Sequence, residues 1–426
     1  MMKMNRREWI KRSGVTGIGL LLSSYIHPGN FINGKRNIIF PGSQGITKAD
    51  FGPDFKWGVA ASAYQTEGAW NLDGKSESNW DYFSQRSGKI ERSENADVAT
   101  DFYHRYVEDI NLIKTMNFKV FRFSLSWSRI LPNGTGEVNQ KGLDFYHRVI
   151  DKCLSVGVEP WITIYHWDMP KCIEDQGGWT NRKILDWFSE YTEVVTKEFG
   201  SKVKNWMVMN EQLSFTGAGY LLGILAPGKK SIKSFLKAVH HSVLCNAGGG
   251  RIIRKNVTNA NVGTTFFTTY IEPVDQNKKN IEAAERSDAL MNRLFIEPCL
   301  GLGYPDKTLP ILKKIRKYQE DGDEERMVFD FNFIGIQYYF RTVVEKSMLP
   351  GIRAKEVKAS KRGVQANEME GEIYPEGLYQ VLSKFNKYEG IRSMIITENG
   401  TCVPDRIENG RVHDSERIGY FKNHLE

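Results

Sequence analysis

The sequence predicts an α/β protein in which parallel strands alternate with helices around one sheet. From about Phe51 onward, short runs rich in β-prone residues alternate with longer segments of helical period, the pattern of successive β/α units. No internal stretch rich in Pro, Gly and Ser interrupts this alternation. The chain has 426 residues, of which 40% are apolar, enough to bury one large core. We therefore expect a single domain over residues 49–426.

Seven strands are expected along this domain, each a short β-prone run. In chain order they are Lys56–Ala61, Lys119–Ser124, Glu159–Tyr165, Lys204–Met209, Asn261–Phe267, Phe333–Gln337 and Ser393–Thr397. The helices expected between them include Asp101–Met116, Lys141–Val156, Arg182–Phe199 and Glu282–Phe295.

Residues 1–48 read as a leader and a short linker rather than as part of the fold. The first 30 residues hold five basic side chains and only Glu8 against them, a local charge of +4 out of the net +7. The apolar run Val15–Ile26 that follows is too short to span a bilayer. The pair Arg6-Arg7 resembles a bacterial twin-arginine export signal, and a disordered basic tail is the alternative. We expect export to the periplasm or outside the cell, without stable membrane insertion afterwards.

The charge pattern and the cysteines narrow the function classes. No basic stripe with interleaved aromatic residues follows the leader, so nucleic acid is not an expected partner. The five cysteines are odd in number and have no metal-ligand spacing, so free thiols are expected, although an exported protein could oxidise one pair. The eight histidines do not gather at ligand spacing, and the neighbours His240 and His241 point in different directions on a helix. Nothing therefore supports a metal site or a metal-dependent hydrolase.

Polar side chains collect where the expected strands end. In a β/α barrel the carboxyl ends of the strands carry the loops of the active site. Turn formation also places polar residues there, so it is their number and chemistry that indicate a site. The residues concerned are Arg122, His166, Asn210, Glu211, Tyr339 and Glu398.

Two of these residues, Glu211 and Glu398, are carboxylates from different strand ends. Glycosidic cleavage needs such a pair, one to protonate the leaving oxygen and one to attack or to activate water, and a separation of roughly 5 Å marks the retaining mechanism. A carboxylate at a strand end is otherwise usually a cap or an ion-pair partner.

Three longer motifs place the pair in a family. The segments Phe55–Gly68 (FKWGVAASAYQTEG), Phe121–Ile130 (FRFSLSWSRI) and Tyr165–Pro170 (YHWDMP) resemble, in order, the sugar-loop motifs of glycoside hydrolase family 1. The resemblance covers residues 51–426. It implies a (β/α)8 TIM barrel and a retaining β-glycosidase that needs no cofactor. The implied partner is a small carbohydrate or an aryl or alkyl β-glycoside.

The resemblance also implies a role for each matching residue. Glu398 would be the nucleophile that forms a covalent glycosyl-enzyme, and Glu211 would be the acid and then the base. Arg122 and Tyr339 would support the charge of the nucleophile. The hydroxyls of the nonreducing sugar would be bound by Gln65, His166 and Asn210, whose amides and neutral imidazole offer both donors and acceptors.

The sequence departs from the family pattern at three places. Gln212 stands where the family usually has proline, which predicts a less firmly held Glu211. Gln337 replaces an asparagine, and its extra methylene predicts an amide pushed too far into the site. The chain ends at Glu426, before the eighth β/α unit of the family, which leaves the first and last expected strands with unpaired edges. A catalytically silent, truncated carbohydrate-binding relative is therefore the alternative function.

Overall fold

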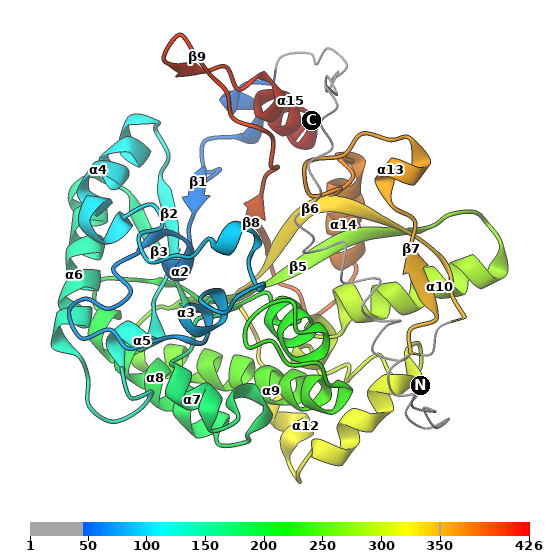
Figure 1. Cartoon of the computed structure of the whole chain (residues 1–426), viewed down its shortest axis with the longest axis horizontal. Coiled ribbons are helices and arrows are strands. Elements are labelled where there is room, and N and C mark those ends of the chain that lie inside the picture. Colours follow the sequence, from blue (N-terminus) through cyan, green and yellow to red (C-terminus); the bar gives the residue numbers. More distant parts are fainter. Residues whose placement is uncertain (1–45, 349–350) are drawn as a thin grey trace.

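Seven parallel strands form one curved wall in the computed structural model, which describes residues 46–348 and 351–426 (Figure 1). The order of the wall follows the chain, so that each strand pairs with the next. This is the strand arrangement of a TIM barrel, and all seven expected strands are confirmed. Their bounds are β1 Gly58–Ala60, β2 Val120–Ser124, β3 Glu159–Tyr165, β4 Asn205–Asn210, β5 Asn261–Pro273, β6 Phe333–Lys346 and β8 Met394–Asn399.

Strands β5 and β6 extend well past the expected ends. They stay paired as far as Pro273 and Val344, beyond a register shift between Thr268 and Tyr270. The short strand β7 (Ala354–Glu356) adds to β6 in antiparallel orientation. The prediction that β6 ends at Gln337 was therefore wrong, because this ribbon continues out of the barrel, and Tyr339 lies within the strand.

Helices cover the outside of the wall. The expected helices appear as α4 (Phe102–Thr115), α6 (Gln140–Ser155) and α8 (Ile184–Phe199). The fourth expected helix begins earlier, as α10 (Lys278–Asp288), and then continues as the π-helical turn η5 (Ala289–Arg293). The further long helices are α9 (Ile232–Asn256), α14 (Glu376–Phe385) and α15 (Ser415–Leu425), and Tyr420 of α15 contacts Asn399 of β8. In the part of the chain that is described, none of the helices has the length and apolar character needed to cross a membrane.

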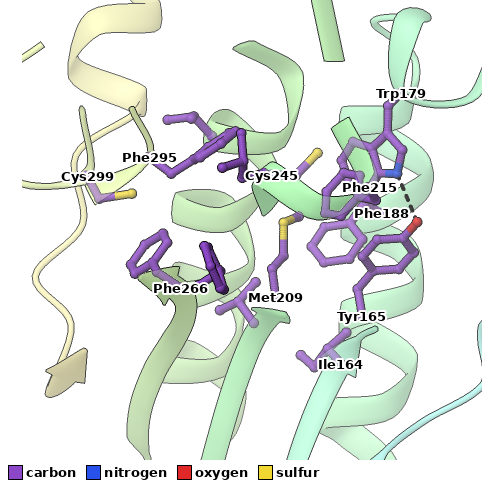
Figure 2. Close-up of a cluster of buried hydrophobic side chains, with 14 of the residues drawn as sticks. Ile164, Tyr165, Trp179, Phe188, Met209, Phe215, Cys245, Phe266, Phe295 and Cys299 are labelled. Carbon is purple, nitrogen blue, oxygen red and sulfur yellow. Dashed lines mark hydrogen bonds between the residues drawn. The ribbon is translucent and has the colours of Figure 1, made fainter. Parts of the chain in front are cut away.

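The main core lies between the wall and helices α8 and α9, and it reaches the loops at the carboxyl end of the barrel (Figure 2). Trp179 and Phe188 are buried there with Met209 of β4. Trp179 Nε1 donates to the hydroxyl of Tyr165 (3.0 Å), which in turn donates to the backbone oxygen of Trp167 (3.0 Å). Buried aromatic residues that also satisfy their polar ends hold neighbouring loops in one place. The core thus fixes the loop that follows β3.

A second, smaller cluster fills the inside of the barrel. Its members come from four different strands and are Val120, Trp161, Met207 and Phe333. Because each precedes the polar strand-end residues on its own strand, the cluster forms an apolar floor below them. The side chains above this floor therefore meet in a site closed on one side.

Candidate active site

The carboxylate of Glu398 is held by three side-chain donors from two other strands. Nη1 of Arg122 lies 2.5 Å from its Oε1, and Nε2 of Gln337 lies 2.6 Å from the same oxygen. The hydroxyl of Tyr339 donates to Oε2. Hydrogen bonds to an ionised group are roughly twice as strong as neutral ones. The side chain of Glu398 keeps 18% of its surface exposed, so the carboxylate is both stabilised and open to a ligand.

A β-bulge in β8 aims Glu398 at this cluster. Ile336 of β6 lies opposite Ile396, but the next residue, Gln337, lies opposite Glu398, so Thr397 is the extra residue. An extra residue in one strand re-aims the side chain that follows it. The bulge therefore brings Glu398 directly opposite Gln337.

Asn210, at the end of β4, is the second residue, after Glu398, on which several hydrogen bonds of the site converge. Its Oδ1 accepts hydrogen bonds from Nη2 of Arg122 (2.5 Å) and Nε2 of Gln337 (2.7 Å). Because a guanidinium can only donate, the atom facing Arg122 must be the oxygen, and Nδ2 of Asn210 faces Nε2 of His166 at 3.1 Å. His166 then accepts at Nε2 and carries its proton on Nδ1. Burial, and the charge of Arg122 after it, lower the pKa of His166 well below its usual value, which keeps the ring neutral.

Glu211 follows Asn210 and is buried, with 5% of its surface exposed. Its backbone has a φ of 46°, in the left-handed region, and its N–H donates to the backbone oxygen of Thr265 (3.0 Å). The hydroxyl of Ser214 donates to Oε2 of Glu211 (2.9 Å). Non-glycine residues held in this region of backbone space concentrate at functional sites. In the sequence, the only signal for Ser214 is a hydroxyl one turn after the carboxylate.

Tyr339 connects the two carboxylates electrostatically. Burial raises the pKa of its phenol well above the usual value, and the charges of Glu398 and then Glu211 raise it further. Both carboxylates therefore act on one phenol. The hydrogen bonds of Gln337 to Asn210 and Glu398 place the two strand ends at one site.

The departure at Gln212 gives the segment after Glu211 a polar contact that proline could not make. Glu211 is not extended, so the backbone bias of a following proline is not what positions it. Gln212 is fully buried, and its Nε2 donates to the hydroxyl of Ser242 on α9 (3.2 Å). That hydrogen bond ties the segment to α9. A less firmly held Glu211 stays a prediction.

The expectation that the amide of Gln337 is pushed too far into the site was wrong. Its longer side chain does not push the amide too far, because Nε2 fits between Oδ1 of Asn210 and Oε1 of Glu398.

Gln65 is the one predicted site residue that stands apart from the cluster. It lies on the short helix α2 (Ala63–Thr66) after β1 and is exposed. Within the described chain, its side chain accepts a hydrogen bond from Ser62 (2.7 Å) and makes none to the residues around Glu398.

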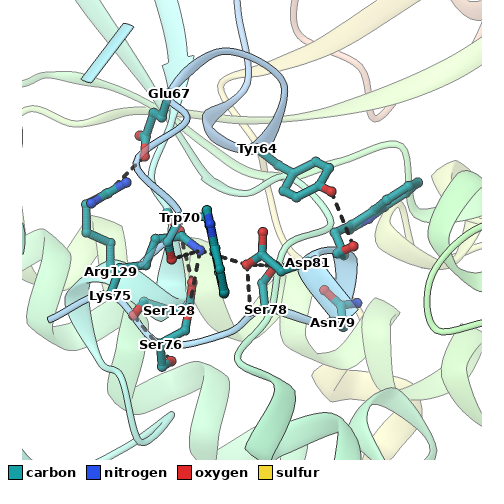
Figure 3. A network of polar contacts seen from close by, with 12 residues as sticks. Tyr64, Glu67, Trp70, Lys75, Ser76, Ser78, Asn79, Asp81, Ser128 and Arg129 are labelled. Carbon is teal, nitrogen blue, oxygen red and sulfur yellow. Dashed lines mark hydrogen bonds and ion pairs between the residues drawn. The ribbon is translucent and has the colours of Figure 1, made fainter. Parts of the chain in front are cut away.

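A buried polar network supports the loop that carries Gln65 (Figure 3). Glu67 accepts from Nε of Arg129 (3.0 Å) and from the hydroxyl of Tyr146 (2.6 Å). Further along the same loop, Lys75 pairs with Asp81 at 2.8 Å. Buried charges are tolerated when they are paired in this way. The motif residues Glu67 and Arg129 therefore hold the loop in place rather than face a substrate.

Aromatic rings border the same end of the barrel. Trp167 donates from Nε1 to the backbone oxygen of Asn210 (3.0 Å) and stacks on Trp80 with ring centroids 6.3 Å apart. Aromatic faces suit sugar rings as well as protein cores. Within the described residues, no group of three or more His, Cys, Asp or Glu side chains could hold a metal ion.

Comparison with known proteins gives this geometry a context. The family model described as glycosyl hydrolase family 1 matches residues 47–426. The chain is 39% identical over 379 residues to β-glucosidase A of Thermotoga maritima, covering 88% of this chain and 84% of that protein. It is 38% identical over 383 residues to β-glucosidase A of Acetivibrio thermocellus, covering 89% and 86%.

The fold is similar to solved structures as well. It matches a family 1 β-glucosidase from Thermotoga maritima with a TM-score of 0.84 and 38% identity over 88% of this chain and 84% of that one. It matches the Thermotoga maritima β-glucosidase in complex with deoxynojirimycin with a TM-score of 0.83 and 38% identity, over 87% and 84%.

Proposed function

This chain belongs to glycosyl hydrolase family 1 and is a retaining β-glycosidase, and we propose that Glu398 and Glu211 carry out its hydrolysis of terminal β-linked glucosides. The observation that carries the assignment is the set of three donors on Glu398. A nucleophile must be ionised and oriented before it attacks, and these donors stabilise and orient the charge. The glucosidase names of the relatives support glucose as the sugar.

The reaction divides into two displacements at the anomeric carbon. Glu398 attacks that carbon while Glu211 gives its proton to the leaving oxygen, so the glycosidic bond breaks and an ester to Glu398 forms. Glu211, now ionised, takes a proton from water, and the water oxygen displaces Glu398. Two inversions return the β configuration, and Glu211 regains its proton.

The neighbouring polar residues support binding of the sugar. His166 is almost fully buried, and its Nδ1 makes no hydrogen bond in the described part of the chain. With the proton on Nδ1, His166 offers a donor, and Asn210 offers the second hydrogen of its amide. A sugar hydroxyl has lone pairs to accept from both. Gln65, on the loop after β1, is exposed and offers a further amide to the sugar.

Azide rescue tests the two roles separately, with a dinitrophenyl β-glucoside as substrate. In Glu211→Ala the first step proceeds because the leaving group needs no proton, and azide then displaces Glu398 to give the β-glucosyl azide. In Glu398→Ala azide attacks directly and gives the α-glucosyl azide. NMR of the products reads the configuration. The same azide configuration from both variants would overturn the assignment.

We also propose that the chain is exported. The support is the basic start with Arg6-Arg7 and the apolar run behind it, which lie outside the described residues. Replacing both arginines by lysine should keep β-glucosidase activity in the cytoplasmic fraction of a bacterial host. Equal activity outside the cytoplasm for both proteins would contradict export by this route.

A further inference from the structure

The side chain of Gln337 lies between the two centres of the site and is fully buried. Its Nε2 is 2.7 Å from Oδ1 of Asn210 and 2.6 Å from Oε1 of Glu398. An amide nitrogen carries two hydrogens, so it can donate to both oxygens at once. We propose that Gln337 is a positioning residue that fixes the carboxylate of Glu398 relative to the amide of Asn210. This inference rests on the proposed role of Glu398 as nucleophile.

The neighbours of Gln337 decide which end of its amide faces the site. Arg122 has donors only, so the atom of Asn210 that it contacts is the oxygen. That oxygen and the carboxylate of Glu398 are both acceptors, and the atom of Gln337 between them must therefore be the nitrogen. The hydrogen bonds of the cluster have one consistent direction, from Arg122 and Gln337 toward Asn210 and Glu398.

Gln337 adds a constraint that Arg122 alone does not supply. Arg122 reaches the same two oxygens from β2, through two different nitrogens, whereas Gln337 reaches them from β6 through one. The last torsion of a glutamate side chain is soft. Donors from two strands on Oε1 and the hydroxyl of Tyr339 on Oε2 fix that torsion. A fixed carboxylate is poised for attack, which is where orientation contributes to rate.

The other end of the same amide carries a cost that an apolar side chain would avoid. Its Oε1 is buried and has no hydrogen-bond partner in the described part of the chain. An unpartnered buried acceptor is destabilising, whereas an apolar side chain of the same shape avoids that penalty. Gln337→Met removes this cost together with the two hydrogen bonds of Nε2, and Arg122 still donates to both oxygens, so the thermal midpoint should change little while activity is lost. A purely structural residue would behave in the opposite way.

The test compares Gln337→Met with the unmodified protein on an aryl β-glucoside over a range of pH. We expect kcat/KM to fall about 10- to 100-fold, the effect of one hydrogen bond to a charged group, and mainly through kcat. The acid limb of the kcat/KM profile should move to higher pH, because the ionised carboxylate has lost a donor. Activity within about twofold of the unmodified protein, with an unmoved acid limb, would overturn the proposal.

Two further variants complete the test. Gln337→Glu keeps the shape and should be active only while the introduced carboxyl is protonated, so its alkaline limb should move to lower pH. This variant decides the question if Gln337→Met does not fold. Thr268→Val is the matched control, because it removes the hydrogen bond of the Thr268 hydroxyl to the backbone oxygen of Gln337 (2.8 Å). Its pH limbs should not move. If Glu211→Ala and Glu398→Ala give the expected azide products but the pH limbs of both Gln337 variants do not move, the role of Gln337 is rejected and the role of Glu398 stands.

Discussion

Ser214 illustrates how single side chains set the chemistry of the two carboxylates. Glu211 must hold a proton in the first step and lose it in the second, while Glu398 must be ionised from the start. Their surroundings differ accordingly, with three side-chain donors on Glu398 and the hydroxyl of Ser214 donating to Glu211. Sequence patterns predicted both carboxylates, but not Ser214 or the helpful role of Gln337, because these contacts depend on side-chain geometry within about an ångström.

Removal of the Ser214 hydroxyl should affect substrates unequally. In Ser214→Ala, Glu211 loses one hydrogen bond, so proton donation to the leaving oxygen becomes less well aligned. For a substrate with a poor leaving group, such as cellobiose, kcat/KM should fall about 2- to 10-fold. For dinitrophenyl β-glucoside, whose leaving group needs no proton, kcat/KM should not change. Kinetics on both substrates give the comparison, and an equal loss on both would argue against this role.

The pairing of strand β8 with β6 orients Glu398 in a way that its own residues do not determine. Its place in the sheet could be predicted from the apolar run before Glu398, but the bulge at Thr397 could not, because a bulge depends on pairing with β6. The long extension of β5 and β6 was missed for the same kind of reason. The long helix α9, whose Ser242 accepts a hydrogen bond from Gln212, was also absent from the helices expected.

Gly335 is the position on β6 that accommodates the bulge. A Cβ atom there would lie 2.8 Å from Cβ of Thr265 and 2.9 Å from the side chain of Thr397. Gly335→Ala should therefore push β8 away and displace Glu398, destabilising the protein by about 1–3 kcal/mol and lowering kcat more than KM. Denaturant unfolding and steady-state kinetics measure the two effects.

Gly248→Ala is the matched control for this substitution. Gly248 lies within α9, and nothing is found within 4 Å of a Cβ built there. The change should stabilise the protein by about 0.5–1 kcal/mol and leave kcat unchanged. A Gly335→Ala protein as stable and active as the control would show that β6 and β8 are not in tight contact.

At the scale of the whole molecule, buried histidines connect stability to pH. Burial lowers the pKa of both His241 and His424 to about 4, and it lowers the pKa of His240 as well. The unfolded chain then binds protons that the native protein does not, so these groups contribute stability that is complete above pH 6.5 and lost as the pH falls toward 4. Burial acts oppositely at Glu174, whose pKa it raises.

Substitution of His241 isolates the contribution of one histidine to the pH dependence of stability. His241 lies on α9, and its Nδ1 contacts the backbone oxygen of Trp179 (2.9 Å). The unmodified protein and His241→Gln should differ less in free energy of unfolding as the pH falls from 6.5 to 4. In the unmodified protein, unfolding exposes the imidazole of His241, which then binds a proton, and the variant has no such group. Urea unfolding at several pH values measures it, with the exposed His413→Gln as control. A difference that stays constant with pH would contradict the account.

The fold of the whole molecule followed from its local patterns more completely than the site did. Alternating strands and helices predicted the seven parallel strands in order, because each β/α unit places its strand beside the last. The site needs in addition the bulge at Thr397, the left-handed backbone of Glu211 and the position of the Gln337 amide. These are set by tertiary packing, so no window of sequence contains them.

The central claim is that Glu398 forms the covalent intermediate, and labelling with a 2-fluoro glucosyl inhibitor tests it most directly. The fluorine slows both displacements, and a good leaving group lets the first proceed, so the glycosyl-enzyme accumulates. Peptide mass spectrometry should find the added fluoroglucosyl group on the peptide that contains Glu398. Folded protein that gains no label, or gains it on a different residue, would contradict the account.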